Sequence, residues 1–221
     1  MIGEDIRAHV FRDTKDFYVH VPPNLVSRQL VAFAKRHAGK EVLDLGCATG
    51  NYCSCLSRAG YNVKGADVNP DYVRIAQQRG VDAYVIEGRV PFPDRSFDTV
   101  LVFEVLEHLS EPEQVIKEAK RLARKNVLFT TPNSGKVEEL QRNGLLFEHF
   151  GDLDHKNFFT EETLVQLLRP HFTRVTVSRG DGISPFAVFP SRALRFAGRA
   201  LTRMRILPPS FHFRLYATAE V

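Results

Sequence analysis

The stretch VLDLGCATG, residues 42–50, decides the interpretation of this sequence. An apolar run of strand type contains an aspartate, and two glycines then frame a tight turn that leads into a helical pattern at 51–59. Glycines at such a turn allow the backbone to approach a ligand closely. We therefore expect a buried strand, a ligand-binding turn and a helix, in that order.

The same alternation of strand and helix continues along the chain. Further strands are predicted at 61–67, 82–88, 97–104, 125–131, 173–179 and 211–221, after the first at 41–45. Helices are predicted at 51–59, 70–78, 111–123 and 160–168. Strands and helices that alternate at this spacing form a parallel sheet covered by helices. The predicted fold class is therefore α/β.

Length and composition favour a single domain over residues 1–221, because 221 residues with 43% hydrophobic content can bury a sizeable core. Within it we expect a helical N-terminal cover at 1–37. An insertion or lid is predicted over the sheet at 133–159, and a basic variable segment at 181–210.

Charge and cysteine content narrow the class of protein. The formal charge of +4 is too small to indicate nucleic-acid binding by itself. We see no apolar run of transmembrane length and no secretory signal pattern. Three cysteines crowded at Cys47, Cys53 and Cys55 form no disulfide framework. Reduced, structural cysteines are typical of a cytoplasmic protein, which is the location we expect.

Two acidic residues define the ligand of the turn. A dinucleotide-binding turn has the spacing G-x-G-x-x-G. The sequence here is G-C-A-T-G, which argues against a nicotinamide-dependent dehydrogenase. Asp44, just before the turn, would repel a pyrophosphate and attract a cation, whereas Asp67, at the end of the second strand, suits the hydroxyls of a ribose. S-adenosylmethionine fits, because it combines a ribose with a positively charged sulfonium and carries no phosphate.

With GADVNP (65–70), VPFPDRSFDTV (90–100) and FEVLEHL (103–109), this stretch resembles the class I S-adenosylmethionine-dependent methyltransferases, type 11/23-like, from about residue 38 to 180. The resemblance implies a Rossmann-like, doubly wound, seven-stranded sheet whose last strand is antiparallel. Two departures are Ala48, in place of the middle glycine, and Glu87-Gly88-Arg89, in place of a Gly-Asp pair. The cofactor-binding residues that it implies are Asp44, Gly46, Cys47, Ala48, Gly50, Asp67, Val68, Glu87, Gly88 and Phe103.

The catalytic candidates are Glu104, Glu107 and His108. If a helix begins at the end of the fourth strand, their spacing places all three on one face. A hydroxyl acceptor must lose its proton, and histidine is the commonest general base, which favours His108. The E-x-x-E-H segment with the later His155 also resembles ubiquinone-pathway O-methyltransferases and small-RNA 3′-terminal ribose 2′-O-methyltransferases. That resemblance implies a divalent ion such as Mg²⁺, Mn²⁺ or Zn²⁺ held by Glu104, Glu107, His108 and His155.

A small-molecule acceptor, methylated on a hydroxyl oxygen, is the preferred hypothesis. RNA ribose 2′-O-methylation is the second enzymatic hypothesis, although no RNA-binding module is evident. A scaffold that binds S-adenosylmethionine without catalysis is the third. The insertion either provides an apolar acceptor pocket or packs on the sheet as a lid. The six residues of this insertion that would line such a pocket are Leu145, Leu146, Phe147, Phe150, Phe158 and Phe159.

A basic stretch at 191–205 has helical periodicity. Arg192, Arg195, Arg199 and Arg203 fall near one face, opposite Leu194, Ala197 and Leu201. The preferred interpretation is a solvated charged face above an apolar stripe that packs on the core. The alternative is a peripheral contact with an anionic membrane or with phosphates.

Overall fold

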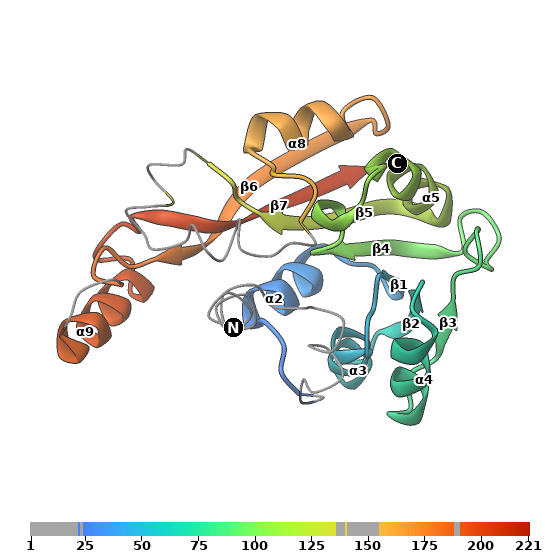
Figure 1. Ribbon diagram of the computed structural model, residues 1–221, viewed down its shortest axis with the longest axis horizontal. Coiled ribbons are helices and arrows are strands. Elements are labelled where there is room, and N and C mark those ends of the chain that lie inside the picture. Colours follow the sequence, from blue (N-terminus) through green and yellow to red (C-terminus); the bar gives the residue numbers. More distant parts are fainter. Residues whose placement is uncertain (1–21, 23, 136–139, 141–154, 188–190) are drawn as a thin grey trace, which may run out of the picture.

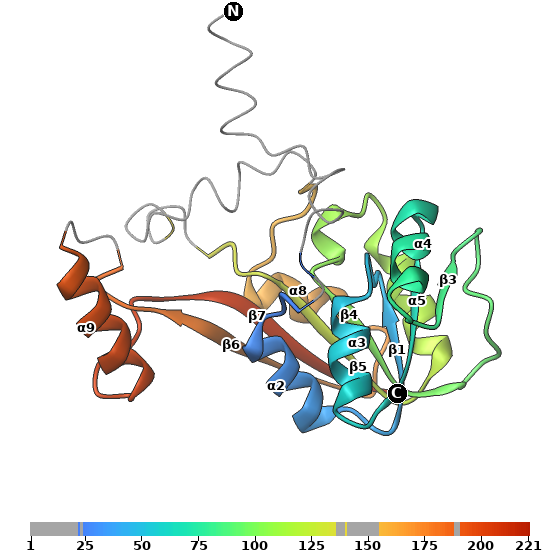
Figure 2. The same ribbon diagram turned by 90° about the horizontal axis from the view of Figure 1, so that it is seen from below.

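The sheet of this protein contains seven strands in the order β3-β2-β1-β4-β5-β7-β6. The computed structural model (Figure 1, Figure 2) describes residues 22, 24–135, 140, 155–187 and 191–221. Neighbours among β1 to β5 pair in parallel, whereas β7 pairs antiparallel with β5 and β6. The predicted α/β sheet with an antiparallel last strand is confirmed. The strands are β1 Glu41–Leu45, β2 Asn62–Asp67, β3 Ala83–Val85, β4 Phe97–Phe103, β5 Ala123–Pro132, β6 Arg174–Ile183 and β7 Phe211–Glu220.

Helices cover both faces of the sheet because successive residues of its central strands point to opposite sides. Val42 and Leu101 belong to the core shared with α2, α3 and α4, whereas Leu43 and Val100 belong to the core shared with α5 and α8. Figure 1 shows these two layers. The helices are α2 Arg28–His37, α3 Asn51–Arg58, α4 Pro70–Gln78, the 3₁₀ turn η1 Leu106–His108, α5 Pro112–Leu122, α8 Glu161–Leu168 and α9 Arg192–Arg203.

The parallel strands bring their carboxyl ends to one edge of the sheet, where ligands bind in folds of this type. The turn at 46–50 follows β1, residues 68–69 follow β2, and residues 104–108 follow β4. Because β7 runs antiparallel to β5, it begins at this same edge, and its register places Arg214 opposite Pro132. The topology therefore gathers the predicted site segments at one edge, together with the start of β7.

Three predicted segments differ in the structure. The strand predicted at 82–88 is only Ala83–Val85, and Gly88, three residues further on, has a left-handed φ of +83°. The predicted N-terminal cover includes α2, whereas residues 1–21 and 23 lie outside the described part. Of the insertion at 133–159, residues 136–139 and 141–154, with Leu145, Leu146, Phe147 and Phe150, also lie outside it. Phe159 is buried in the core, whereas Phe158 is 42% exposed.

The apolar stripe predicted for the basic helix is the fourth difference. Leu194 is 44% exposed and Ala197 is exposed, whereas Leu201 is half-buried and Gly198 is the buried residue of α9. The side predicted as a core stripe is therefore buried only in part. Within the described ranges, no helix is both long enough and apolar enough to cross a bilayer.

Candidate active site

The turn after β1 is built from residues in the left-handed region. Gly46 has a φ of +89° and Gly50 a φ of +78°. A Cβ on Gly46 would lie 2.5 Å from the Val105 side chain, so glycine is required there for both conformation and space. Ala48 also adopts a left-handed φ of +45°, which costs about 1 kcal/mol relative to glycine. Ala48 therefore takes the left-handed conformation that the usual middle glycine would adopt. The turn also lies against Val105, in the segment after β4.

Asp67 ties this turn to the end of β2. One carboxylate oxygen accepts a hydrogen bond from the Ala48 amide at 2.8 Å, and the other accepts one from the Asn69 amide at 2.9 Å. A carboxylate has about four acceptor positions, so lone pairs remain for ribose hydroxyls. Burial raises the pKa of Asp67, and hydrogen bonds from the backbone amides of Asn69, Ala48 and Val68 oppose that shift. Asp67 thus has a structural role beside its predicted contact with the ribose.

Asp44 is a buried carboxyl group beneath the turn, with 2% of its surface exposed. The Cys53 thiol donates to its Oδ2 at 3.4 Å. Burial is the main cause that raises the pKa of Asp44 to about 7, the Cys53 contact opposes the shift, and the negative charge of Asp67 adds to it. Gly65, its partner in register on β2, leaves room for the nearby thiols, since a Cβ there would meet Cys47 Sγ at 2.7 Å. Near neutral pH this carboxyl therefore changes its charge readily.

If S-adenosylmethionine binds at this turn, as the sequence resemblance implies, its affinity should depend on pH. Its positive sulfonium would favour the Asp44 carboxylate, so binding below pH 7 would first have to remove a proton from this group. We expect the Kd to rise roughly eightfold between pH 7.5 and pH 6. Calorimetry measures this, and S-adenosylhomocysteine, which lacks the sulfonium charge, should show a weaker dependence. In Asp44→Asn the difference between the two ligands should disappear, and equal pH dependence of both ligands in the unmodified protein would contradict this role of Asp44.

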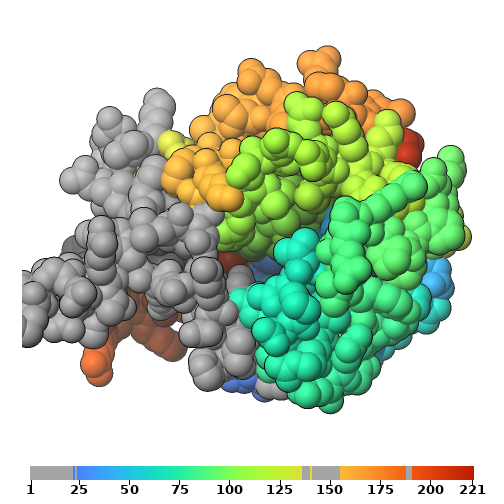
Figure 3. Space-filling model, turned by 45° about the vertical axis from the view of Figure 1, so that its right-hand side comes forward, coloured from blue at the N-terminus to red at the C-terminus, as the bar shows by residue number. Residues whose placement is uncertain are grey.

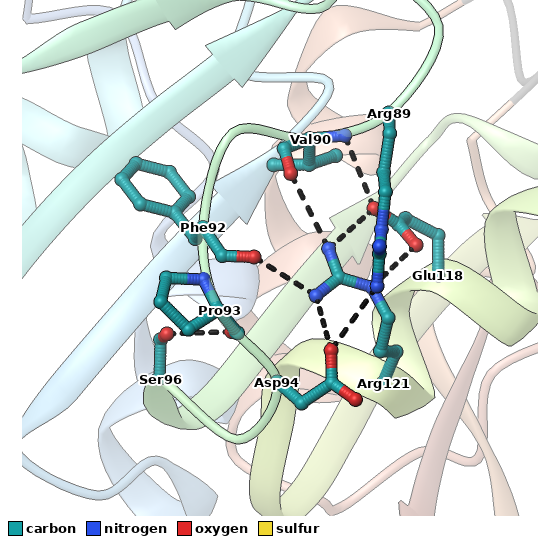
Figure 4. A network of polar contacts seen from close by, with 8 residues as sticks. All are labelled: Arg89, Val90, Phe92, Pro93, Asp94, Ser96, Glu118 and Arg121. Carbon is teal, nitrogen blue, oxygen red and sulfur yellow. Dashed lines mark hydrogen bonds and ion pairs between the residues drawn. The ribbon is translucent and has the colours of Figure 1, made fainter.

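The predicted adenine side of the site consists of Val68, Glu87 and Gly88. Val68 is 72% exposed, so its side chain is available to pack against the predicted adenine ring. The loop that follows Gly88 is fixed to α5 by Arg121 (Figure 4). Its guanidinium donates to the carbonyl oxygens of Val90 and Phe92 and pairs with Asp94 and Glu118.

Phe103, a predicted cofactor-binding residue at the end of β4, packs in the core with 7% of its surface exposed. Its ring packs edge-to-face on Tyr52 of α3, with 5.9 Å between centroids, and 6.1 Å from Phe33 of α2. These contacts join the end of β4 to α3, the helix that follows the turn at 46–50.

Figure 3 shows a hollow on the surface between α4, in teal, and the yellow-green segment that carries α5.

The segment after β4 does not continue as a helix, so the predicted shared face of Glu104, Glu107 and His108 is wrong. Glu104 has a left-handed φ of +54°, and only the short 3₁₀ turn η1 follows. The Glu104 carboxylate accepts a hydrogen bond from Arg214 Nε at 2.9 Å. This residue is therefore directed toward β7.

The structure brings Glu107, His108 and His155 together. Their ligand-type atoms all lie within 4.8 Å of one another, and the two imidazole centroids are also 4.8 Å apart. The backbone explains this: the Lys156 and Asn157 amides both donate to the Glu107 carbonyl oxygen, at 2.6 and 3.0 Å. Glu107 is 1% exposed, whereas both histidines are half-buried. The candidate centre thus consists of one buried carboxyl group and two half-buried imidazoles. Glu104, which the sequence resemblance also implied as a ligand, does not belong to this group.

Sequence reasoning missed the polar network on β7. The Arg214 guanidinium lies between Glu104 and Asp181, and the Tyr216 hydroxyl donates to Asp181 Oδ1 at 3.1 Å. Burial would lower the pKa of Arg214, but the two carboxylates raise it, so it stays charged. The available signal was an arginine within the apolar strand pattern at 211–221, because an arginine that is largely withdrawn from water needs partners.

Comparison with known proteins agrees with this architecture. The family model described as "Methyltransferase domain" matches residues 18–171, so the chain belongs to this family of S-adenosylmethionine-dependent methyltransferases. A demethylmenaquinone methyltransferase of Tropheryma whipplei (strain Twist) is 34% identical over 90 residues, which cover 38% of each chain. A ubiquinone biosynthesis O-methyltransferase of Ralstonia nicotianae is 34% identical over 104 residues, which cover 42% of this chain and 44% of the relative.

The chain thus spans about two fifths of the length of these curated relatives. Among solved structures, a SAM-dependent methyltransferase from Archaeoglobus fulgidus superimposes with a TM-score of 0.63 at 18% identity. The superposition covers 88% of this chain and 95% of that one, which shows the shared fold.

Proposed function

We propose that the protein transfers a methyl group from S-adenosylmethionine to a hydroxyl oxygen of a small-molecule acceptor, with His108 as the general base. The observation that carries this proposal is the group of Glu107, His108 and His155 at the edge of the sheet where β4 ends. Val105, in the same segment, contacts the turn at Gly46. A base in this segment is therefore beside the turn that would hold the methyl donor.

The chemistry explains why such a base is useful. Methyl transfer is a displacement in which the acceptor oxygen attacks the methyl carbon opposite the departing sulfur, so alignment provides much of the catalysis. A neutral hydroxyl is a weak nucleophile and becomes positively charged unless its proton leaves. In this proposal the His108 imidazole accepts that proton. Relatives named for ubiquinone biosynthesis and for demethylmenaquinone support a small-molecule acceptor.

A metal-assisted form of the same reaction is the second candidate, favoured by the grouping of one carboxylate and two imidazoles. This donor set suits Zn²⁺ or Mn²⁺. With bonds of about 2.1 Å, two ligands of one ion lie at most about 4.2 Å apart. The 4.8 Å limit therefore requires only small rotations of Glu107, His108 or His155. A bound ion would lower the pKa of the acceptor hydroxyl, and His108 would then be a ligand and no longer a base.

Product analysis tests the proposal. The protein is incubated with methyl-labelled S-adenosylmethionine and a cell extract separated into small molecules, RNA and protein. We expect label in the small-molecule fraction, in a bond that resists mild base as an ether does. Label in RNA, lost when terminal 2′-hydroxyls are blocked, would favour ribose methylation. Tight S-adenosylhomocysteine binding with no label in any fraction would favour a scaffold.

Metal analysis separates the two forms of the mechanism. The protein as purified is analysed for metals, and S-adenosylhomocysteine is titrated in EDTA and then with Mg²⁺, Mn²⁺ or Zn²⁺. Activity that survives EDTA supports His108 as the base. A stoichiometric metal that is lost in Glu107→Gln and in His155→Ala would instead support the metal-assisted form, and catechol hydroxyls would be the first acceptors to test.

A further inference from the structure

The positive charge of this protein is concentrated around α9. Residues 182–213 contain five arginines and no acidic residue. The other residues carry 25 of the 30 lysines and arginines and all 26 acidic residues, so they have no excess of positive charge. The five arginines are Arg192, Arg195, Arg199, Arg203 and Arg205.

Large apolar side chains are exposed beside these arginines. Phe196 is 77% exposed and Met204 is 67% exposed. Phe196 follows Arg192 by four residues and precedes Arg199 by three, so these side chains lie along one face of the helix. That face therefore combines positive charge with exposed apolar surface. Exposed apolar surface of this kind is typical of a contact with a partner or a membrane.

The opposite face attaches α9 to the rest of the protein. Gly198 is buried against the loop after β6, where a Cβ would lie 2.7 Å from Phe186 and from Ser184 Oγ. Both Figure 1 and Figure 2 show α9 extending away from the sheet and from the other helices. The helix begins with Ser191 as its N-cap, whose hydroxyl accepts from the Leu194 amide. The contact at Gly198 thus fixes the helix with its basic and apolar face outward.

We propose that α9 lies on the surface of an anionic membrane, with Phe196 and Met204 inserted at the level of the headgroups and the arginines on lipid phosphates. Interfacial helices combine these features: an apolar strip and flanking cations whose long side chains reach the headgroups. An RNA backbone would use the arginines but would leave Phe196 and Met204 in water. The exposed apolar residues therefore favour the bilayer.

The topology makes this contact relevant to the site. β7 follows α9 and begins at the edge of the sheet where β1 and β4 end. A membrane-bound α9 would hold that edge near the bilayer, and an acceptor dissolved in lipid could then reach it. Membrane binding itself is independent of the acceptor and of the proposed reaction, so the two fail or succeed separately.

Flotation with lipid vesicles tests the proposal on the full chain. One set of vesicles is phosphatidylcholine, and the other contains about one third phosphatidylglycerol. We expect binding to the anionic set that weakens with salt. The triple variant Arg192→Gln, Arg199→Gln, Arg203→Gln should bind about 100-fold more weakly, at roughly fivefold per arginine. The pair Phe196→Ser, Met204→Ser should bind at least about tenfold more weakly.

Matched controls separate the helix from net charge. Arg36, Arg58 and Arg74 are exposed arginines on other helices, and their triple replacement by glutamine removes the same charge. This control variant should keep most of the binding. All variants must also keep their thermal unfolding temperature and their S-adenosylhomocysteine affinity, which excludes misfolding as the cause.

Fluorescence supplies a second measurement, because the chain contains no tryptophan. Phe196→Trp introduces a single reporter, whose emission should shift to shorter wavelength with anionic vesicles only. The proposal is overturned if the unmodified chain does not float with anionic vesicles at low salt. It is also overturned if the control triple loses as much binding as the α9 triple, or if mixed-sequence RNA binds as tightly as the vesicles and independently of Phe196.

Discussion

Replacing Asp67 with alanine is expected to weaken S-adenosylhomocysteine binding by roughly 100-fold or more, while the protein remains folded. Each hydrogen bond to a charged group contributes about 1.5–3 kcal/mol, and a ribose diol would donate two of them. The variant also loses the acceptor for the Ala48 and Asn69 amides, so the turn is less ordered. Calorimetry gives the affinity, and thermal unfolding shows whether the fold is retained.

A ligand that lacks one hydroxyl separates these two effects. The 2′-deoxy form of S-adenosylhomocysteine should bind the unmodified protein more weakly than the parent ligand. In the Asp67→Ala variant the two ligands should bind alike, because the acceptor of the hydroxyl is gone. Asp71→Asn, at an exposed aspartate four residues further along, is the matched control and should leave affinity unchanged. If the difference in affinity between the two ligands persisted in Asp67→Ala, the ribose hydroxyls would have to bind a residue other than Asp67.

The second large effect is expected for His108→Ala, which should lower kcat by about 10²- to 10⁴-fold, the range for removal of a general base. The affinity for S-adenosylhomocysteine should stay nearly the same, because His108 faces the acceptor in the proposed function. Single-turnover rates measured with saturating cofactor give this comparison. His171→Ala, at a half-buried histidine just after α8, is the control and should keep full activity.

The double variant Glu107→Ala, His108→Ala should likewise lose activity and keep cofactor affinity. Glu107 is buried, so Glu107→Gln is the milder companion that preserves its volume. If cofactor affinity and activity fell together in these variants, the segment would have a structural role only.

Much of the fold could be predicted because it depends on local patterns. Apolar runs bounded by glycine, proline and polar residues identified β1, β2, β4 and β5 to within a few residues. The helix at 70–78 was predicted with the bounds that α4 has, because Asn69 and Pro70 are a strong start signal. The gathering of Asp44, Asp67 and the 104–108 segment at one edge follows from parallel topology alone.

What could not be predicted depends on contacts between distant segments. Glu104 takes a left-handed conformation that its sequence neighbours do not favour, and its partner Arg214 is 110 residues away. His155 reaches His108 because the Lys156 and Asn157 amides bind a carbonyl across the fold. The face that α9 leaves exposed depends on Gly198 meeting Phe186, which helical periodicity alone does not reveal.

The place of β7 has a consequence for the order in which the chain is made. β7 lies between β5 and β6 in the sheet, although it follows β6 in the sequence. During synthesis, β6 is therefore complete before β7, its neighbour in the sheet, has been made. Glu104 likewise has no Arg214 to pair with until β7 has been made. The core of β1 to β5 can form during synthesis. Residues 104–108, beside the turn at 46–50, reach their final arrangement only after residues 211–220 have emerged. A chain interrupted before that point can therefore be partly folded and still lack activity.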